Sequence, residues 1–137
     1  MISENSSSFW YFPNLSHLVE MHNEARGGKI NSWLGADKTL LEMDDNLMNY
    51  AQNWAIHMSE KERLYHSSMK DIMRLGFNKV GENIAYGQKN EEAVMKTWMN
   101  SPGHRSNIMN NSFNRIGCGF SYSDNDVIYW CVCFGRI

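Results

Sequence analysis

The chain has 137 residues, 42% hydrophobic and 20% charged, which is typical of a single globular domain with its own core. The net charge of −2 and the lack of long basic runs give no electrostatic basis for binding nucleic acid or anionic membrane surfaces. No segment approaches the roughly 18 consecutive apolar residues of a transmembrane helix. We expect a monomer.

Residues 1–13 are predicted to form an N-terminal tether that precedes a domain over residues 14–137. The tether begins with a serine-rich polar stretch, which is typical of flexible segments, and continues with four aromatic residues at 9–12 that we expect to pack on the domain. Met1 need not be the natural start of the protein, so a targeting segment could have preceded it.

Apolar residues at helical spacing predict a first helix over 15–26 that ends at Gly27-Gly28 and has a core histidine, His22, on its buried side. Residues 29–43 are expected to be a connector. A second helix begins at Asp44 or Asp45. Its apolar stripe consists of Leu47, Ala51, Trp54, Ala55 and Met58.

The second half of the chain mixes helices and strands. A short helix is predicted over 68–75, a strand over 80–86, a helix capped by Asn90 and a helix restart at Ser101-Pro102. Glu91 and Glu92 are expected on a solvated face near the helix start. Two strands over 114–121 and 127–134 end the chain. These elements predict an α+β fold, an α-β-α sandwich with a small antiparallel sheet between helical layers.

Three cysteines are too few for a disulfide scaffold. Cys131 and Cys133 are two residues apart and therefore point to the same side of a strand, while Cys118 lies in the preceding strand. We expect three small buried thiols, with one cross-strand disulfide as the alternative. A zinc site made of cysteines alone is not expected, because the spacing is not a zinc knuckle and no fourth ligand is near.

Polar residues are concentrated among core residues between Gly81 and Ile108, where they are costly unless they are paired or functional. Glu82 is the most informative carboxylate, because it lies in a segment that is otherwise apolar. His104 lies in the first turn of a helix, whose positive end favours a neutral imidazole. His66 is distant in sequence, so it can join His104 only if the fold brings the two together. The predicted lining of a polar cleft is His66, Glu82, Asn83, Ser101, His104 and Arg105.

Sequence motifs of established catalytic machinery are absent: the chain has no Gly-x-Ser-x-Gly elbow, no His-Glu-x-x-His and no phosphate-binding loop. Ser67 and Ser106 lie near histidines, but serine is common and this signal is weak. The sequence therefore identifies no secure nucleophile.

The ordered motifs of the chain resemble the CAP superfamily, which comprises cysteine-rich secretory proteins, antigen 5 and pathogenesis-related proteins of group 1. The resemblance covers about residues 15–135. The form of the motif at residues 98–105 is closer to the bacterial branch than to the animal or plant ones. It rests on His22-Asn23-x-x-Arg26, Ala51-Gln-x-Trp54, His66-Ser67, Gly81-Glu-Asn-Ile-Ala85, Trp98-Met-Asn-Ser-Pro-Gly-His-Arg105, Asn107-Ile108, Ile116-Gly-x-Gly119, Tyr129-Trp130 and Phe134-Gly135.

The resemblance implies an α-β-α sandwich outside the cytoplasm, with a central cavity that carries two histidines and acidic residues and that holds a divalent metal in some members. By motif, the predicted metal ligands are His66, His104 and Glu82, with zinc as the candidate ion. Where the animal and plant pattern has a second acid, this chain has Ser101, so the set of four is incomplete. The family has no generally accepted enzymatic activity to carry over.

Three functions follow as hypotheses. The first is a secreted or surface-tethered binding module whose partner is an extracellular protein, a glycan or a lipid. The second is a metal-assisted hydrolase that uses His66 and His104, with Glu82 as general base or as an orienting group. The third is a lipid or sterol carrier in which some of the ten methionines line an apolar groove. Extracellular or cell-surface localisation is expected, with lipid anchoring through a removed N-terminal segment as one route.

Overall fold

The computed structural model describes residues 11–27 and 40–137. The first ten residues of the predicted tether and most of the predicted connector lie outside these ranges. The helices are α2 (Leu15–Ala25), α4 (Asp45–Lys61), α5 (Met69–Met73), α6 (Glu91–Met99) and α7 (Pro102–Met109). The strands are β1 (Glu42–Met43), β2 (Lys79–Tyr86), β3 (Arg115–Tyr122) and β4 (Ile128–Arg136).

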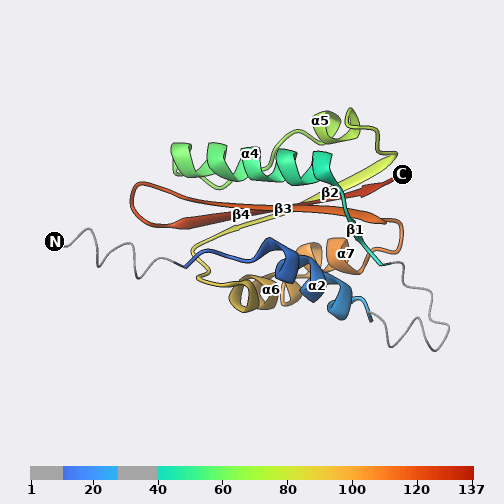
Figure 1. The fold of residues 1–137 in the computed structure, drawn as a ribbon, viewed down its shortest axis with the longest axis horizontal. Coiled ribbons are helices and arrows are strands. Elements are labelled where there is room, and N and C mark those ends of the chain that lie inside the picture. Colours follow the sequence, from blue (N-terminus) through green and yellow to red (C-terminus); the bar gives the residue numbers. More distant parts are fainter. Residues whose placement is uncertain (1–10, 28–39) are drawn as a thin grey trace.

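The four strands form one sheet in the order β1-β3-β4-β2. Helices α4 and α5 cover one face of the sheet, and α2, α6 and α7 cover the other (Figure 1). The predicted α-β-α sandwich is therefore confirmed. The sequence did not reveal β1, which pairs in parallel with β3. Both residues of β1 are exposed, so the strand has no alternation of apolar and polar residues to indicate it.

Side-chain caps explain where four of the helices begin. Asn14, Asp44, Ser68 and Asn90 each accept a hydrogen bond from a backbone amide in the first turn of their helix. Ser101 occupies the N-cap position of α7, as predicted, but its side chain makes no capping bond. That hydroxyl is used elsewhere, as described below.

The alternation of β4 divides the interior into two cores. Trp130 and Val132 pack toward α2, α6 and α7, whereas Tyr129, Cys131 and Cys133 pack beneath α4. Strand β3 lets α4 approach closely because it has glycine where the helix crosses. A Cβ atom added at Gly117 would lie 2.1 Å from the carbonyl carbon of Leu47, so no side chain fits there.

All three cysteines are free and buried, which confirms the expectation of small buried thiols. Cys118 pairs with Val132 in the β3–β4 register and packs in the core between the sheet and helices α2, α6 and α7. Cys131 and Cys133 lie on the opposite face of the sheet. The alternative of a cross-strand disulfide is therefore wrong, because the sheet itself separates Cys118 from the other two thiols.

The prediction that Glu91 lies on a solvated face is wrong, because this residue is fully buried. Its carboxylate accepts hydrogen bonds from the Tyr11 hydroxyl and from the backbone amide of Asn14. The Tyr122 hydroxyl in turn donates to the Tyr11 carbonyl. The end of the predicted tether at residues 11–13 is thereby attached to the domain.

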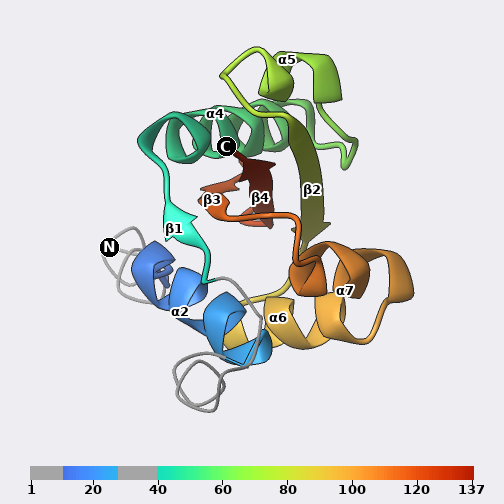
Figure 2. The same cartoon turned by 90° about the vertical axis from the view of Figure 1, so that its right-hand side faces the viewer.

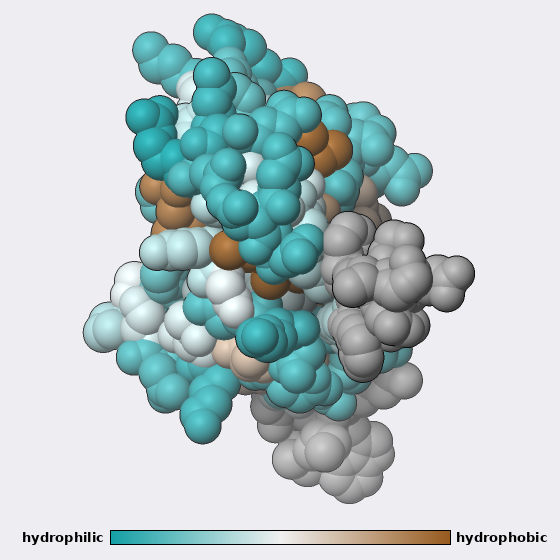
Figure 3. Space-filling view, turned by 90° about the vertical axis from the view of Figure 1, so that its left-hand side faces the viewer, coloured by the Kyte–Doolittle hydropathy of each residue, from teal (hydrophilic) through white to brown (hydrophobic). Residues whose placement is uncertain are grey.

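None of the helices in the described part of the chain has both the length and the apolar character needed to cross a bilayer. Figure 3 shows one end of the molecule, where the surface is mostly hydrophilic and hydrophobic residues are confined to small, separate areas. The coloured part of this face therefore offers no broad apolar surface.

Candidate functional site

The edge strand β2 connects the two helical layers at the candidate site. In Figure 2 this strand runs along one side of the sheet, with α5 beyond one end and α7 beyond the other. Alternation along the strand places neighbouring side chains on opposite faces. Glu82 points to the α4 side, where His66 and Ser67 lie in the loop before α5, and Asn83 points to the α7 side.

Glu82 is a buried carboxylate that accepts several hydrogen bonds. His66 Nδ1 lies 2.8 Å from its Oε1 atom, and the Ser67 amide donates to the same oxygen at 3.0 Å. The Ser67 hydroxyl donates to Oε2 at 2.5 Å. These bonds compensate the cost of burying the carboxylate and fix the orientation of the His66 ring. Because Ser67 donates to Glu82 rather than to a histidine, it is not arranged as a nucleophile.

His104 is held in a different way. Its Nδ1 atom lies 2.9 Å from the hydroxyl oxygen of Ser101, which is why that serine does not cap α7. Burial lowers the pKa of His104, and the charge of His66 lowers it further. The predicted preference for neutral imidazole is therefore supported, but desolvation is the main cause. The ligand atoms of the predicted metal set His66, Glu82 and His104 do not all lie within 4.8 Å of one another.

Asn83 is a fully buried residue next to Glu82 on β2. Its side-chain amide donates to the His104 carbonyl at 3.0 Å. Asn107 donates to the Asn83 side-chain oxygen at 2.8 Å and to the Glu82 carbonyl at 3.2 Å. These bonds attach α7 to the edge strand. The sequence placed Asn107 in a motif without indicating this role. Arg105, which was predicted to line the cleft, is exposed on the same helix.

The two histidines share a chemically useful pattern. Each has its Nδ1 atom anchored, His66 by Glu82 and His104 by Ser101, and within the described residues neither Nε2 atom has a hydrogen-bond partner. The His66 side chain is 58% exposed. An anchored Nδ1 with a free Nε2 is how metal-ligating histidines are usually oriented, and it also suits hydrogen bonding to a ligand. We call His66, Glu82, Ser101 and His104 the histidine site.

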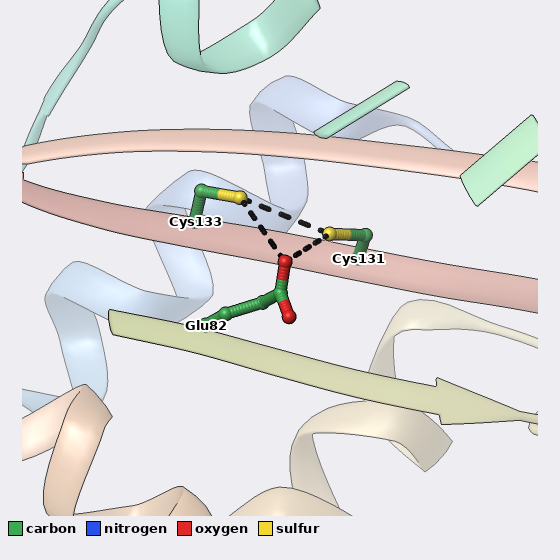
Figure 4. Close-up of side chains that lie close together, drawn as sticks. All are labelled: Glu82, Cys131 and Cys133. Carbon is green, nitrogen blue, oxygen red and sulfur yellow. Dashed lines mark hydrogen bonds between the residues drawn. The ribbon is translucent and has the colours of Figure 1, made fainter. Parts of the chain in front are cut away.

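A second cluster, which sequence reasoning missed, lies on the other side of the Glu82 carboxylate. Among the described residues, one set of three His, Cys, Asp or Glu side chains has its ligand atoms within 4.8 Å of one another: Glu82, Cys131 and Cys133 (Figure 4). The alternation of β4 and the position of Glu82 on a strand were both visible in the sequence. The pairing of β2 with β4, which joins them, was not.

A separate surface pocket of about 330 Å³ is lined by Lys79, Asn111, Ser112 and Arg136. Lys79 and Arg136 are register partners at the end of the β2–β4 pair, three residues along β2 from Glu82. This pocket shares none of the residues of the histidine site.

Comparison with known proteins places these features in a family. The sequence model of the cysteine-rich secretory protein family, CAP, matches residues 19–134. The chain is 40% identical over 88 residues to the uncharacterized protein YkwD of Bacillus subtilis. That match covers 58% of this chain but 34% of YkwD, so the chain spans about a third of this relative.

Solved structures agree in fold. An outer surface protein from Borrelia burgdorferi superposes with a TM-score of 0.76 at 26% identity, covering 89% of this chain and 91% of that one. An extracellular SCP-domain protein from Bacillus anthracis has a TM-score of 0.70 at 25% identity, covering 89% of this chain and 40% of that one. The family model accounts for nearly the whole domain, and this chain belongs to the cysteine-rich secretory protein (CAP) family.

Proposed function

We propose that this chain is a binding domain that acts outside the cytoplasm and contacts its partner through the histidine site. The observation that carries the proposal is the pair of histidines anchored at Nδ1 with free Nε2 atoms. The nearby Arg105 adds an exposed positive charge. These groups favour a partner that presents carboxylates or other oxygen atoms, as an extracellular protein or an acidic glycan does.

The extracytoplasmic location is supported by relatives described as an outer surface protein and as an extracellular protein. A lipid anchor upstream of the domain would fit such a location. Carriage of a lipid or sterol has less support, because the pocket described above is lined by two basic and two polar residues rather than by the methionines that this hypothesis requires.

Binding is tested with fluorescently labelled domain and three targets: intact bacterial cells, isolated cell-envelope glycan and lipid vesicles. We expect saturable binding to cells that falls at least about tenfold in the His66→Ala/His104→Ala double variant. His17→Ala is the matched control, because it removes a half-exposed histidine on α2, outside the site. Saturable binding that is unchanged in the double variant would refute a role for the histidine site.

A metal-assisted hydrolase is the second candidate, and the Nδ1–carboxylate contact of His66 is the observation that favours it. Glu82 would orient His66, and the two Nε2 atoms would hold Zn²⁺, which would polarise a bound water when present. NaASP2, a structurally similar protein at 18% identity, has been crystallised with Zn²⁺. Two imidazoles are one ligand short of the three protein ligands of catalytic zinc sites, and Ser101 replaces the second acid of the family pattern.

Calorimetric titration of Zn²⁺ into the metal-free domain separates the two candidates. Binding of one ion at micromolar affinity that is lost in the His66→Ala/His104→Ala variant would justify a screen of ester, peptide and phosphoester substrates. Turnover that is abolished both by a chelator and by this variant would favour the hydrolase. Turnover that persists with the chelator would rule out a metal-dependent reaction at the histidine site.

A further inference from the structure

The sheet register places two thiols and one carboxylate together beneath α4. Cys131 and Cys133 are alternate residues of β4 and therefore point to the same face. On the neighbouring antiparallel strand, Glu82 is the register partner of Cys133. Figure 4 shows the three side chains converging from β2 and β4. We call this set the thiol site.

The spacing of the three side chains matches the size of a coordination sphere. The two Sγ atoms are 3.8 Å apart, and they lie 3.8 Å (Cys131) and 4.0 Å (Cys133) from Glu82 Oε2. The point equidistant from all three atoms lies about 2.2 Å from each. Zinc–thiolate bonds are about 2.3 Å long and zinc–carboxylate bonds about 2.0–2.2 Å. The spacing of the three donor atoms, which hydrogen-bond to one another in this structure, therefore matches these bond lengths.

The donor atoms and their surroundings select the kind of ion. Thiolate ligands favour zinc and monovalent copper, whereas magnesium and calcium require oxygen ligands. Both cysteines are fully buried, and the Glu82 side chain is 0% exposed. They lie in an apolar core whose other members include Ala55, Met58 and Ile84. A dry site of this kind favours soft ions that hold few water molecules.

Glu82 also gives the thiol site a connection to the surface. Its Oε2 atom faces the sulfurs and also accepts from the Ser67 hydroxyl, whereas Oε1 contacts the half-exposed His66 ring and the amide of Ser67. The thiols are therefore separated from the outer loop by one carboxylate group.

We propose that Cys131, Cys133 and Glu82 form a buried binding site for a thiophilic d¹⁰ cation, Zn²⁺ or Cu(I), which shares only Glu82 with the histidine site. The ion replaces the two thiol protons, which are released to solvent, and the sulfurs bind as thiolates. Three protein ligands suit Cu(I) directly and leave one position for a further ligand on zinc. This inference does not rest on the proposed function, because its sulfur ligands take no part in the histidine site.

Cobalt is the probe for the first experiment, because a Co²⁺–thiolate bond produces a charge-transfer band in the near ultraviolet that Co²⁺–imidazole binding lacks. We expect the reduced, metal-free full chain to develop this band with one Co²⁺ per chain. Competition with Zn²⁺ and, without oxygen, with Cu(I) then identifies which ion binds more tightly. Absence of the band at saturating Co²⁺ would overturn the proposal.

Matched variants locate the ion. Cys131→Ser/Cys133→Ser should lose the band, whereas Cys118→Ser should retain it, because Cys118 is equally buried but lies on the opposite face of the sheet. His104→Ala should also retain it, because His104 is bonded to Ser101 and not to Glu82. Loss of the band in the Cys118 variant would indicate adventitious thiol binding, and loss in the His104 variant would make the thiol site dependent on the histidine site. Either result contradicts the proposal.

A measurement on the wild-type chain covers the case in which the double cysteine variant does not fold. The thiols are alkylated under mild denaturation with and without Zn²⁺, and the modified positions are identified by mass spectrometry. We expect Zn²⁺ to slow the alkylation of Cys131 and Cys133 at least about tenfold relative to that of Cys118. Alkylation of Cys131 and Cys133 at the same rate with and without Zn²⁺ would contradict the proposal.

Discussion

His66 Nδ1 lies 2.8 Å from Glu82 Oε1, although the Glu82 side chain is fully buried and the His66 side chain is 58% exposed. A carboxylate accepts, so Nδ1 of His66 donates to it, and in the neutral form of the ring the lone pair is at Nε2. The buried group therefore sets the tautomer of the exposed one. Glu82 on the edge strand β2 therefore affects both the stability of the fold and the atom through which His66 can bind a ligand.

Replacement of Glu82 by glutamine should destabilise the fold. The amide keeps one acceptor but places a donor group where His66 or Ser67 now donates, leaving a buried donor unsatisfied. We expect a loss of about 2 kcal/mol in the free energy of unfolding, measured by urea titration. Glu92→Gln is the matched control, because Glu92 is exposed near the start of α6. Equal stability of the two variants would show that the carboxylate network contributes nothing.

Replacement of Ser101 by aspartate should strengthen metal binding at the histidine site. The substitution restores an acid at the position where the family pattern has one, and it places a negative charge beside His104. We expect Zn²⁺ affinity, measured by calorimetry, to rise by about tenfold or more.

The control for the Ser101 substitution is Ser106→Asp. It adds the same charge at an exposed position of α7 and should change the affinity little. If both variants gain equally, the effect is a general electrostatic one, and Ser101 is not positioned to complete the site.

His22 should make the domain less stable in mild acid. This histidine is fully buried, and burial lowers its pKa from 6.5 to about 4. Below pH 6.5 His22 becomes protonated in the unfolded chain, whereas in the folded chain it stays neutral until about pH 4. The free energy of unfolding therefore falls as the pH is lowered across this interval. The expected loss between about pH 7 and about pH 5 is about 2 kcal/mol from this group.

Urea titrations of the wild type and of His22→Phe at both pH values isolate this contribution. Other titrating groups affect both proteins equally, so the difference between their pH dependences reports His22 alone. Phenylalanine retains a ring against Trp98 and Phe134, which lie 6.1 and 5.7 Å from the histidine ring centroid. If the free energy of unfolding depends on pH in the same way in both proteins, the pKa of His22 is not lowered in the folded state.

Substitution of Gly117 by alanine should disrupt the packing of α4 on the sheet. The added Cβ atom would lie 2.1 Å from a backbone atom of Leu47, which cannot move aside as a flexible side chain can. We expect a loss of at least about 3 kcal/mol in unfolding free energy, or loss of soluble protein. Gly103→Ala is the control, because a Cβ atom there meets nothing within 4 Å. Near wild-type stability of Gly117→Ala would show that α4 can shift away from β3.

The sequence determined most of the local structure of this protein. Caps such as Asp44 and Asn90 act within a few residues of themselves, and the alternation of β4 depends on its own residues, so both were readable without a fold. The motifs containing Glu82 and His104 also identified the family. The two-residue strand β1 was missed, because its pairing with β3 supplies its structure and its own residues give no pattern.

Only the tertiary structure decided what the polar residues do. The sequence could not show that Glu82 bonds Ser67, that Ser101 holds His104 instead of capping its helix, or that Glu91 is buried against Tyr11. Nor could it show that Glu82 faces Cys131 and Cys133 while Cys118 lies across the sheet. Each of these outcomes depends on which strands pair and in what register, and that choice is made by packing between residues that are far apart in the chain.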